Sequence, residues 1–336
     1  MSEPSLVRRV EGRAGTLLMN RPRALNALDL AMIRDFAAAI AAWRDDAAVS
    51  LVILEGAGGR AFCAGGDVRQ VRQDALDGDA LAVRAFFEAE YAVNFGIATF
   101  PKPWVSLIDG VCMGGGIGLA LHNGPRVVTE AALLAMPETA IALFPDVGTS
   151  HVLPRLPGAL GTWLALTGAR LKGADAVHAG LATHCVPQER IPALRAALVE
   201  TGDPLQVERF AVTPPEAAFA PHLDAIHRCF AEPTVLGILA ALDAEGTEWA
   251  ERQAAILRRM SPTSLCVSLE LLRRTASLDL RGALDEELHL TAGVILGHPD
   301  FREGVRSVLV DKDGAPAWSP ATLEEVDAAA VLALFR

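Results

Sequence analysis

The sequence has few cysteines, and it lacks the spacings by which cysteine or histidine would bind a metal. The five cysteines are odd in number and widely scattered, with no C-x-x-C pair: Cys63, Cys112, Cys185, Cys229 and Cys266. A disulfide framework or a structural zinc site needs a paired or clustered set. The eight histidines form no H-x-x-x-H pair, and no G-x-S-x-G motif is present. These absences argue against zinc-dependent and serine hydrolysis, and we expect no metal site and no redox cofactor.

Positive charge is also scarce. The chain has 30 Lys and Arg against 41 Asp and Glu, which gives a formal net charge of −11 at pH 7. A nucleic acid or an anionic membrane is bound through an excess of positive charge that displaces counterions. The composition therefore argues against both kinds of partner. It does not argue against a small anionic ligand, because a local group of arginines acts over roughly 8–10 Å.

No apolar run approaches the ~20 residues that a membrane-spanning helix needs. The longest candidate, Val111–Leu121, is interrupted by four glycines. The opening segment, MSEPSLVRRV, contains neither the apolar region of a signal peptide nor a long stretch rich in Arg and Ser. We therefore expect no membrane association and a cytoplasmic location.

What the sequence does contain is a strand-and-helix pattern followed by a helical one. Leu51–Leu54 is a continuous apolar run, typical of a strand covered on both faces, and Asp29 precedes a helical spacing over 30–43. From about Gly158 helical spacing dominates, with helices predicted over 236–242, 248–260 and 263–272 and a proline-rich linker over 203–221. The pattern predicts the α/β class, with a core over 1–205 and a helical C-terminal region over 206–336.

Two glycine-rich loops each follow a predicted strand. They span Gly56–Gly66 and Gly114–Gly118, and neither has the G-x-x-x-x-G-K-[ST] or G-x-G-x-x-G spacing of phosphate-binding loops. Such loops can point two backbone N–H groups at one carbonyl oxygen and so form an oxyanion hole. The alternative interpretation is that the glycines only permit close packing of the backbone.

Three motifs, in order along the chain, resemble the crotonase (enoyl-CoA hydratase/isomerase) superfamily. They are R-P-R-A-L-N-A-L over 21–28, A-F-C-A-G-G-D-V over 61–68 and D-G-V-C-M-G-G-G over 109–116. The resemblance implies a spiral of β-β-α units that binds an acyl-CoA, with the thioester carbonyl between the N–H groups of Gly66 and Gly115. It also implies substrate-binding residues in the first two motifs: Ala24, Asn26, Ala64, Gly65 and Asp67.

The carboxylates distinguish the branches of this superfamily, because function depends on the site and not on the fold. Hydratases carry one glutamate where this chain has Gly118 and a second that matches Glu138. This chain instead has Asp146, eight positions after Glu138, in M-P-E-T-A-I-A-L-F-P-D-V-G. That segment resembles the 3-hydroxyisobutyryl-CoA hydrolase branch, as do M-S-P-T-S-L over 260–265 and D-F-R-E-G-V-R over 300–306. One departure is G-T-S over 148–150, where the branch often continues in glycine. The resemblance implies that Glu138 and Asp146 are the catalytic carboxylates.

Each carboxylate also has a structural interpretation. Glu138 can be a loop residue in a surface salt bridge. Asp146 can cap the helix that follows it, and this role is compatible with a catalytic one. Glu90, beside Tyr91, aligns with a glutamate near the acyl pocket of the hydrolases and can hydrogen-bond a substrate hydroxyl. Alternatively, Glu90 lies on a solvated helix face.

The expected function is hydrolysis of the thioester of 3-hydroxyisobutyryl-CoA in valine catabolism, with 3-hydroxypropionyl-CoA as a second substrate. Coenzyme A arrives as part of this acyl-CoA substrate and is not a cofactor. Glu138 either attacks the carbonyl, giving a mixed anhydride, or acts as general base for water. The alternatives are an enoyl-CoA hydratase or isomerase, and a non-catalytic acyl-CoA-binding protein of the same fold. A homo-oligomer also remains open, because many crotonases are trimers or hexamers.

Overall fold

The structure, a computed structural model, describes residues 4–336 and divides into two units that alternate along the chain. The first, here called the sheet unit, contains residues up to Gly66 together with 89–135 and 170–218. The second, called the helical unit, contains 67–88, 136–169 and 219–336. The sequence predicted a single boundary, at residue 205. Each unit of the structure instead contains three separate segments of the chain. Which segments carry separate functions stays a prediction.

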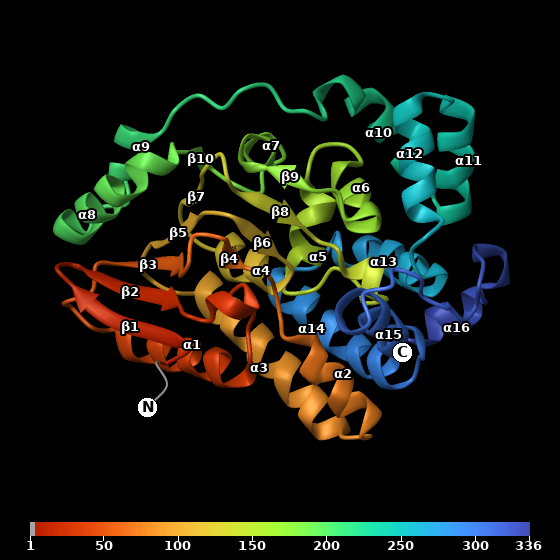
Figure 1. Cartoon of the computed structure of the whole chain (residues 1–336), viewed down its shortest axis with the longest axis horizontal. Coiled ribbons are helices and arrows are strands. Elements are labelled where there is room, and N and C mark those ends of the chain that lie inside the picture. The colour runs from red at the N-terminus through yellow and green to blue at the C-terminus, as the bar shows by residue number, and fades with distance from the viewer. Residues whose placement is uncertain (1–3) are drawn as a thin grey trace. The chain divides into compact units, whose positions relative to one another are not determined.

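A six-stranded sheet forms the centre of the sheet unit, in the order β1-β2-β3-β5-β7-β10 (Figure 1). Its strands are β1 (Leu6–Glu11), β2 (Ala14–Met19), β3 (Leu51–Gly56), β5 (Trp104–Ile108), β7 (Arg126–Val128) and β10 (His184–Cys185). β1 and β2 are antiparallel, and the other neighbours are parallel. The side chains of Leu51–Leu54 are all buried, which confirms the prediction for this apolar run.

A second, four-stranded sheet carries the glycine loops. Its order is β4 (Ala61–Cys63), β6 (Val111–Met113), β8 (Leu133–Ala135) and β9 (Leu171–Lys172). β4 pairs with β6 in parallel, and Cys63 lies opposite Cys112. Since parallel neighbours end at the same edge of a sheet, the loops that follow β4 and β6 leave from one edge.

Helices cover the sheets within the sheet unit. They are α1 (Leu30–Trp43), α4 (Gly115–Leu121), α7 (Gly173–His178), α8 (Ile191–Thr201) and α9 (Gln206–Phe210), with single turns η1 (Pro22–Ala24) and η4 (Gln188–Arg190). The carboxylate of Asp29 accepts the N–H of Met32 at 2.8 Å, which confirms the predicted N-cap of α1. From α8, Leu194 and Leu198 pack on the sheet against Ile53 and Val105, where they form its core.

The helical unit is built mainly from helices. They are α2 (Val68–Leu76), α5 (Thr149–Val152), α6 (Leu160–Thr167), α10 (Leu223–Phe230), α11 (Val235–Glu245), α12 (Glu248–Leu257), α13 (Pro262–Thr275), α14 (Leu280–Thr291), α15 (Asp300–Val305) and α16 (Ala328–Ala333). Single turns of 3-10 or π helix join them: η2 (Glu138–Ile141), η3 (Leu153–Arg155), η5 (Ala220–His222), η6 (Ala292–Leu296), η7 (Arg306–Val310) and η8 (Leu323–Glu325). A long helix, α3 (Ala80–Ala98), passes from the helical unit into the sheet unit after Glu88.

The predicted helices of the C-terminal region are confirmed as α11, α12 and α13, each started by a side-chain cap. Thr234, Thr247 and Ser261 accept the N–H of the residue three positions on. Two features were not expected. The predicted linker contains the helix α9. Two-residue strands, β9 and β10, lie beyond Gly158, where the sequence predicted mainly helices. Strands this short leave no periodic pattern in the sequence. In residues 4–336, no helix is both long and apolar enough to span a membrane.

Candidate active site

The two glycine loops meet at one edge of the four-stranded sheet. The N–H of Leu28 donates to the carbonyl of Gly65 at 2.9 Å, and Leu28 forms a parallel bridge with Gly66. A Cβ placed on Gly65 would lie 3.5 Å from the backbone N of Gly115, and one placed on Gly115 would lie 3.4 Å from the N of Gly66. The backbone amides predicted for the oxyanion hole are therefore neighbours. Gly65 also has a φ of +100°, which favours glycine at this turn.

Glu90 of α3 lies against the second loop. A Cβ on Gly115 would fall directly against its Oε1 atom, so a side chain at 115 would displace the carboxylate. The side chain is only 3% exposed, which contradicts the interpretation of Glu90 as a residue on a solvated helix face. The Glu90 carboxylate therefore lies beside the backbone amides of Gly66 and Gly115, all within the sheet unit.

The opening motif holds the first loop through Asn26. Its Oδ1 accepts the N–H of Arg21 at 3.0 Å, and its Nδ2 donates to the carbonyls of Ala57 and Ala61 at 3.0 and 2.8 Å. These bonds tie the motif to the segment between β3 and β4. Asn26 therefore has a structural role, and a contact with substrate stays a prediction.

The remaining predicted binding residues lie at different places. Ala24 is exposed on η1, and Ala64 is half-buried with its N–H bonded to the carbonyl of Leu25 at 3.0 Å. Asp67 belongs to the helical unit, where it stands at the N-cap of α2. Their contacts with substrate stay predictions.

Glu138 begins the 3-10 turn η2 in the helical unit. It is 5% exposed, which contradicts its interpretation as a surface salt-bridge residue. The turn is closed by the N–H of Leu143, which donates to the carbonyl of Glu138 at 3.0 Å. It is anchored by the hydroxyl of Thr139, which donates to the carbonyl of Leu166 at 3.1 Å. The backbone that carries Glu138 is thus fixed by packing on the end of α6.

Asp146 lies in the loop that leads to α5 and is 4% exposed. The N-cap of α5 is Gly148, so the Asp146 side chain does not occupy the capping position. Its backbone carbonyl accepts the N–H of Thr149 at 2.8 Å and the Thr149 hydroxyl at 2.7 Å. The interpretation of Asp146 as a helix cap is therefore wrong, and its carboxylate is held in a buried turn.

That turn contains a strained backbone. Val147 has a φ of +54° and Gly148 a φ of +78°. Glycine tolerates this region, but for a β-branched residue such as valine it costs of order 1–3 kcal/mol. Such a conformation persists only where surrounding contacts hold it.

The contact that holds this turn comes from Glu287 of α14, which sequence reasoning missed. Its Oε2 accepts the N–H of Gly148 at 2.9 Å, and its Oε1 accepts the hydroxyl of Ser150 at 2.5 Å. Glu287 is 0% exposed. In the sequence it follows Asp285 and Glu286, and such an acidic run is typical of a solvated helix face. The spacing of Leu284 and Leu288, four positions apart on the helix, is the one sequence feature that indicates a buried face near Glu287.

The environment of Glu287 favours its neutral form. Burial raises the pKa of this carboxyl well above its usual 4.5, and the nearby charge of Asp146 raises it further. Hydrogen bonds from Ser150 and Gly148 oppose these effects. Glu287 thus keeps a proton to higher pH than an exposed glutamate does.

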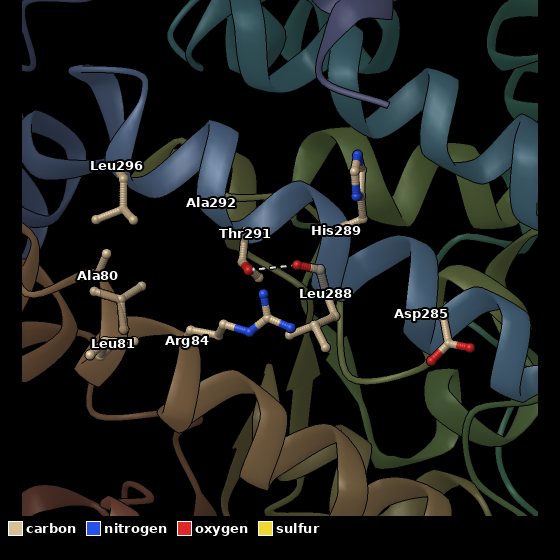
Figure 2. Close-up of a pocket in the computed structure, with 10 residues that line it drawn as sticks. Ala80, Leu81, Arg84, Asp285, Leu288, His289, Thr291, Ala292 and Leu296 are labelled. Atoms are coloured by element: carbon tan, nitrogen blue, oxygen red, sulfur yellow. Dashed lines mark hydrogen bonds between the residues drawn. The ribbon is translucent and has the colours of Figure 1, made fainter. Parts of the chain in front are cut away.

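The other face of α14 lines an open pocket of about 510 Å³ (Figure 2). Its walls are the first turns of α3, with Leu81 and Arg84, and the segment from Asp285 to Leu296. The hydroxyl of Thr291 donates to the carbonyl of Leu288 at 2.7 Å along this wall. None of the site residues predicted from the sequence lines this pocket.

No group of three or more His, Cys, Asp or Glu in the part of the chain that the structure describes could hold a metal ion.

The chain matches the family model described as enoyl-CoA hydratase/isomerase over residues 14–335. It is 45% identical to 3-hydroxyisobutyryl-CoA hydrolase, mitochondrial, of Xenopus tropicalis over 94% of this chain and 84% of that protein. Two crystal structures are also similar, each covering 99% of this chain and 97% of the other. One is a carnitinyl-CoA dehydratase from Mycobacterium thermoresistibile, with a TM-score of 0.95 and 40% identity. The other is an enoyl-CoA hydratase from Rhodobacter sphaeroides, with a TM-score of 0.92 and 41% identity.

These comparisons confirm the predicted α/β fold of the crotonase type. They also correct one expectation. The cytoplasmic location inferred from composition is contradicted, because the relative from Xenopus tropicalis and others of its kind are named as mitochondrial proteins.

Proposed function

Because the chain belongs to the enoyl-CoA hydratase/isomerase family, we propose that it hydrolyses the thioester of 3-hydroxyisobutyryl-CoA to the free acid and coenzyme A. This reaction is a step of valine catabolism. The observation that carries the proposal is the pair of buried carboxylates, Glu138 and Asp146, in a chain that has Gly118 where hydratases have a glutamate. 3-Hydroxypropionyl-CoA is proposed as a second substrate, since it also presents a 3-hydroxyl group.

In the proposed reaction the backbone N–H groups of Gly66 and Gly115 bind the carbonyl oxygen as it becomes an oxyanion. Each such donor is typically worth ~10²–10³ in rate. The neighbouring positions of the two amides support this role. Glu90 would form a hydrogen bond with the substrate hydroxyl. The other contacts with the acyl-CoA would come from residues of the two N-terminal motifs: Ala24, Asn26, Ala64, Gly65 and Asp67.

Glu138 acts at the carbonyl carbon in one of two ways. As a nucleophile it forms a mixed anhydride, the C–S bond breaks, and water then cleaves the anhydride. As a general base it takes a proton from the water that attacks the carbonyl. Asp146 orients the substrate hydroxyl or the water and assists protonation of the departing thiolate. No metal or redox cofactor enters either route, and coenzyme A is part of the substrate.

The second candidate is an enoyl-CoA hydratase, the activity named for the similar protein from Rhodobacter sphaeroides. Addition of water across a double bond in that scheme uses two carboxylates, and Gly118 removes one of them. A third, a non-catalytic acyl-CoA-binding protein, would bind the thioester without cleaving it.

The experiment that separates the three measures two signals on the same substrates. Release of free thiol from 3-hydroxyisobutyryl-CoA and 3-hydroxypropionyl-CoA is compared with loss of the enoyl chromophore of crotonyl-CoA. We expect fast thiol release and little loss of the chromophore. Faster chromophore loss would favour the hydratase, and binding without either signal would favour the non-catalytic protein. Molecular mass in solution would test the prediction of a homo-oligomer.

A further inference from the structure

We propose that Glu287 is a positioning residue for this reaction, whose carboxyl group holds the turn from Asp146 to Ser150 and thereby orients the Asp146 side chain. The inference rests on the proposed function, because it assigns to Asp146 a part in thioester cleavage. None of the motifs quoted above contains Glu287, which lies 141 positions after Asp146 in sequence.

The geometry of the contact supports positioning. The two carboxyl oxygens bind two different groups of the same turn, the N–H of Gly148 and the hydroxyl of Ser150. A planar carboxyl group with both oxygens occupied fixes the distance and the orientation of the turn relative to α14. Glu287 and Ser150 are fully buried, so water does not compete for these bonds.

The link from Glu287 to Asp146 is short and rigid. The N–H held by Glu287 belongs to the peptide that follows Val147, the residue with the strained φ of +54°. The next N–H, that of Thr149, returns to the Asp146 carbonyl at 2.8 Å. From the far side, the hydroxyl of Thr275 on α13 donates to the Ser150 carbonyl at 2.7 Å. Release of the Glu287 contact would free the strained turn to relax, and Asp146 would move with it.

The charges around Glu287 identify Asp146 as the group that it acts on. On α5, the Nδ1 of His151 is 3.1 Å from the carbonyl of Leu278. On α13, Arg274 pairs with Glu270 at 2.8 Å and with Glu286 at 3.4 Å. Burial lowers the pKa of His151, and the Arg274 guanidinium is paired with two glutamates, whereas the charge of Asp146 acts on Glu287 directly. The two buried carboxyl groups therefore form an electrostatically coupled pair.

A double-mutant cycle tests the proposal. Glu287→Gln keeps the shape but puts an NH2 group in place of one carboxyl oxygen, and this group cannot accept the hydrogen bond that Gly148 or Ser150 donates. We expect kcat for thiol release from 3-hydroxyisobutyryl-CoA to fall about tenfold or more, with KM changed less than about threefold. In an Asp146→Asn background the same substitution should lower kcat by less than about twofold further, because its effect passes through Asp146. Glu286→Gln is the matched control on the same helix and should stay within about twofold of wild type.

The outcomes separate this inference from the proposed function. An Asp146→Asn variant with near-wild-type kcat for thiol release would remove Asp146 from the mechanism and overturn the role of Glu287, while the proposed hydrolysis would stand. A wild-type protein that releases no thiol from either substrate would overturn the proposed function itself. Two outcomes would overturn only the role of Glu287. In the first, Asp146→Asn lowers kcat but Glu287→Gln does not. In the second, the two losses of kcat multiply in the double variant. If Glu287→Gln fails to fold, Ser150→Ala takes its place in the cycle. This substitution removes the Ser150 hydroxyl, one of the two groups that donate a hydrogen bond to Glu287. Ser150→Ala should then lower kcat about threefold or more, and its loss should also vanish in the Asp146→Asn background.

Discussion

The carboxylate of Glu90 fills the space beside Gly115 that a side chain at position 115 would occupy. This relationship joins a helix residue to the glycine loop proposed to bind the oxyanion, and both belong to the sheet unit. A side chain at 115 would therefore displace the Glu90 carboxylate.

Gly115→Ala should therefore displace Glu90 and disturb the Gly115 amide together. We expect kcat for thiol release to fall ~10²-fold or more, on the scale of one lost oxyanion donor. Gly96→Ala, further along α3, is the control, because its new methyl group would meet only the flexible side chain of Ile40 at 3.2 Å. Equal activity of the two variants would argue that the loop and Glu90 take no part in the reaction.

Glu138→Gln should keep the fold and the affinity for acyl-CoA while losing most of the turnover. The amide is nearly isosteric with the carboxylate but is neither nucleophile nor base. Because the lost interaction acts in the transition state, kcat should fall far more than KM changes. Retention of more than roughly a tenth of wild-type kcat, a barrier change under about 1.4 kcal/mol, would remove Glu138 from the mechanism.

Asp146→Asn should cost ~10²-fold or more in rate, because proton transfer needs the carboxylate itself. The N-cap of α5 is Gly148, so a loss of helix capping cannot account for the change. Asp146→Gly removes the carboxylate altogether, and we expect it to lose thiol release without gaining hydration, since Gly118 still supplies no carboxylate. Thermal midpoints of both variants, measured beside kcat, separate loss of rate from loss of stability. Hydration of crotonyl-CoA by Asp146→Gly would contradict the assignment of the two carboxylates.

Glu287 should make stability depend on pH. Its folded-state pKa is raised above the 4.5 of the unfolded chain, so its contribution is fully present below about pH 4.5 and is lost as the pH rises through the folded-state value. Over that range the thermal midpoint of wild type should fall relative to that of Glu287→Gln, which has no proton to lose. Thermal unfolding from about pH 4.5 to about pH 8 measures this, with Glu286→Gln as the control. Parallel curves for wild type and Glu287→Gln would show that Glu287 is not shifted.

Asn26→Ala should destabilise the protein by ~2–4 kcal/mol, because three hydrogen bonds to the backbone are lost in a buried place. The matched control is Asn123→Ala, since the Asn123 amide donates to the carbonyls of Ile97, Phe100 and Lys102. Denaturant unfolding and KM are measured for both. Comparable losses of stability with unchanged KM indicate that Asn26 only holds the loop, whereas a raised KM for Asn26→Ala alone supports contact with substrate.

The sequence by itself was sufficient for the parts of the molecule that depend on local pattern. The buried run Leu51–Leu54 predicted a strand covered on both faces, and Asp29 predicted the start of α1. The ordered motifs around Gly66 and Gly115 predicted the fold and family through their resemblance to the crotonase superfamily. The same resemblance singled out Glu138 and Asp146, and their catalytic roles stay predictions.

Only the tertiary structure decided which distant residues meet. The burial of Glu90 depends on the approach of α3 to the loop after β6, and helical spacing alone left a solvated face equally open. Glu287 lies in an acidic run that is typical of an exposed face, and its burial depends on α14 packing against the turn that follows Asp146. That turn is itself set by a positive φ at Val147, which valine avoids when local preference acts alone. Contacts far apart in the sequence supply the energy that overrides such preferences, and they leave no periodic signal in the chain.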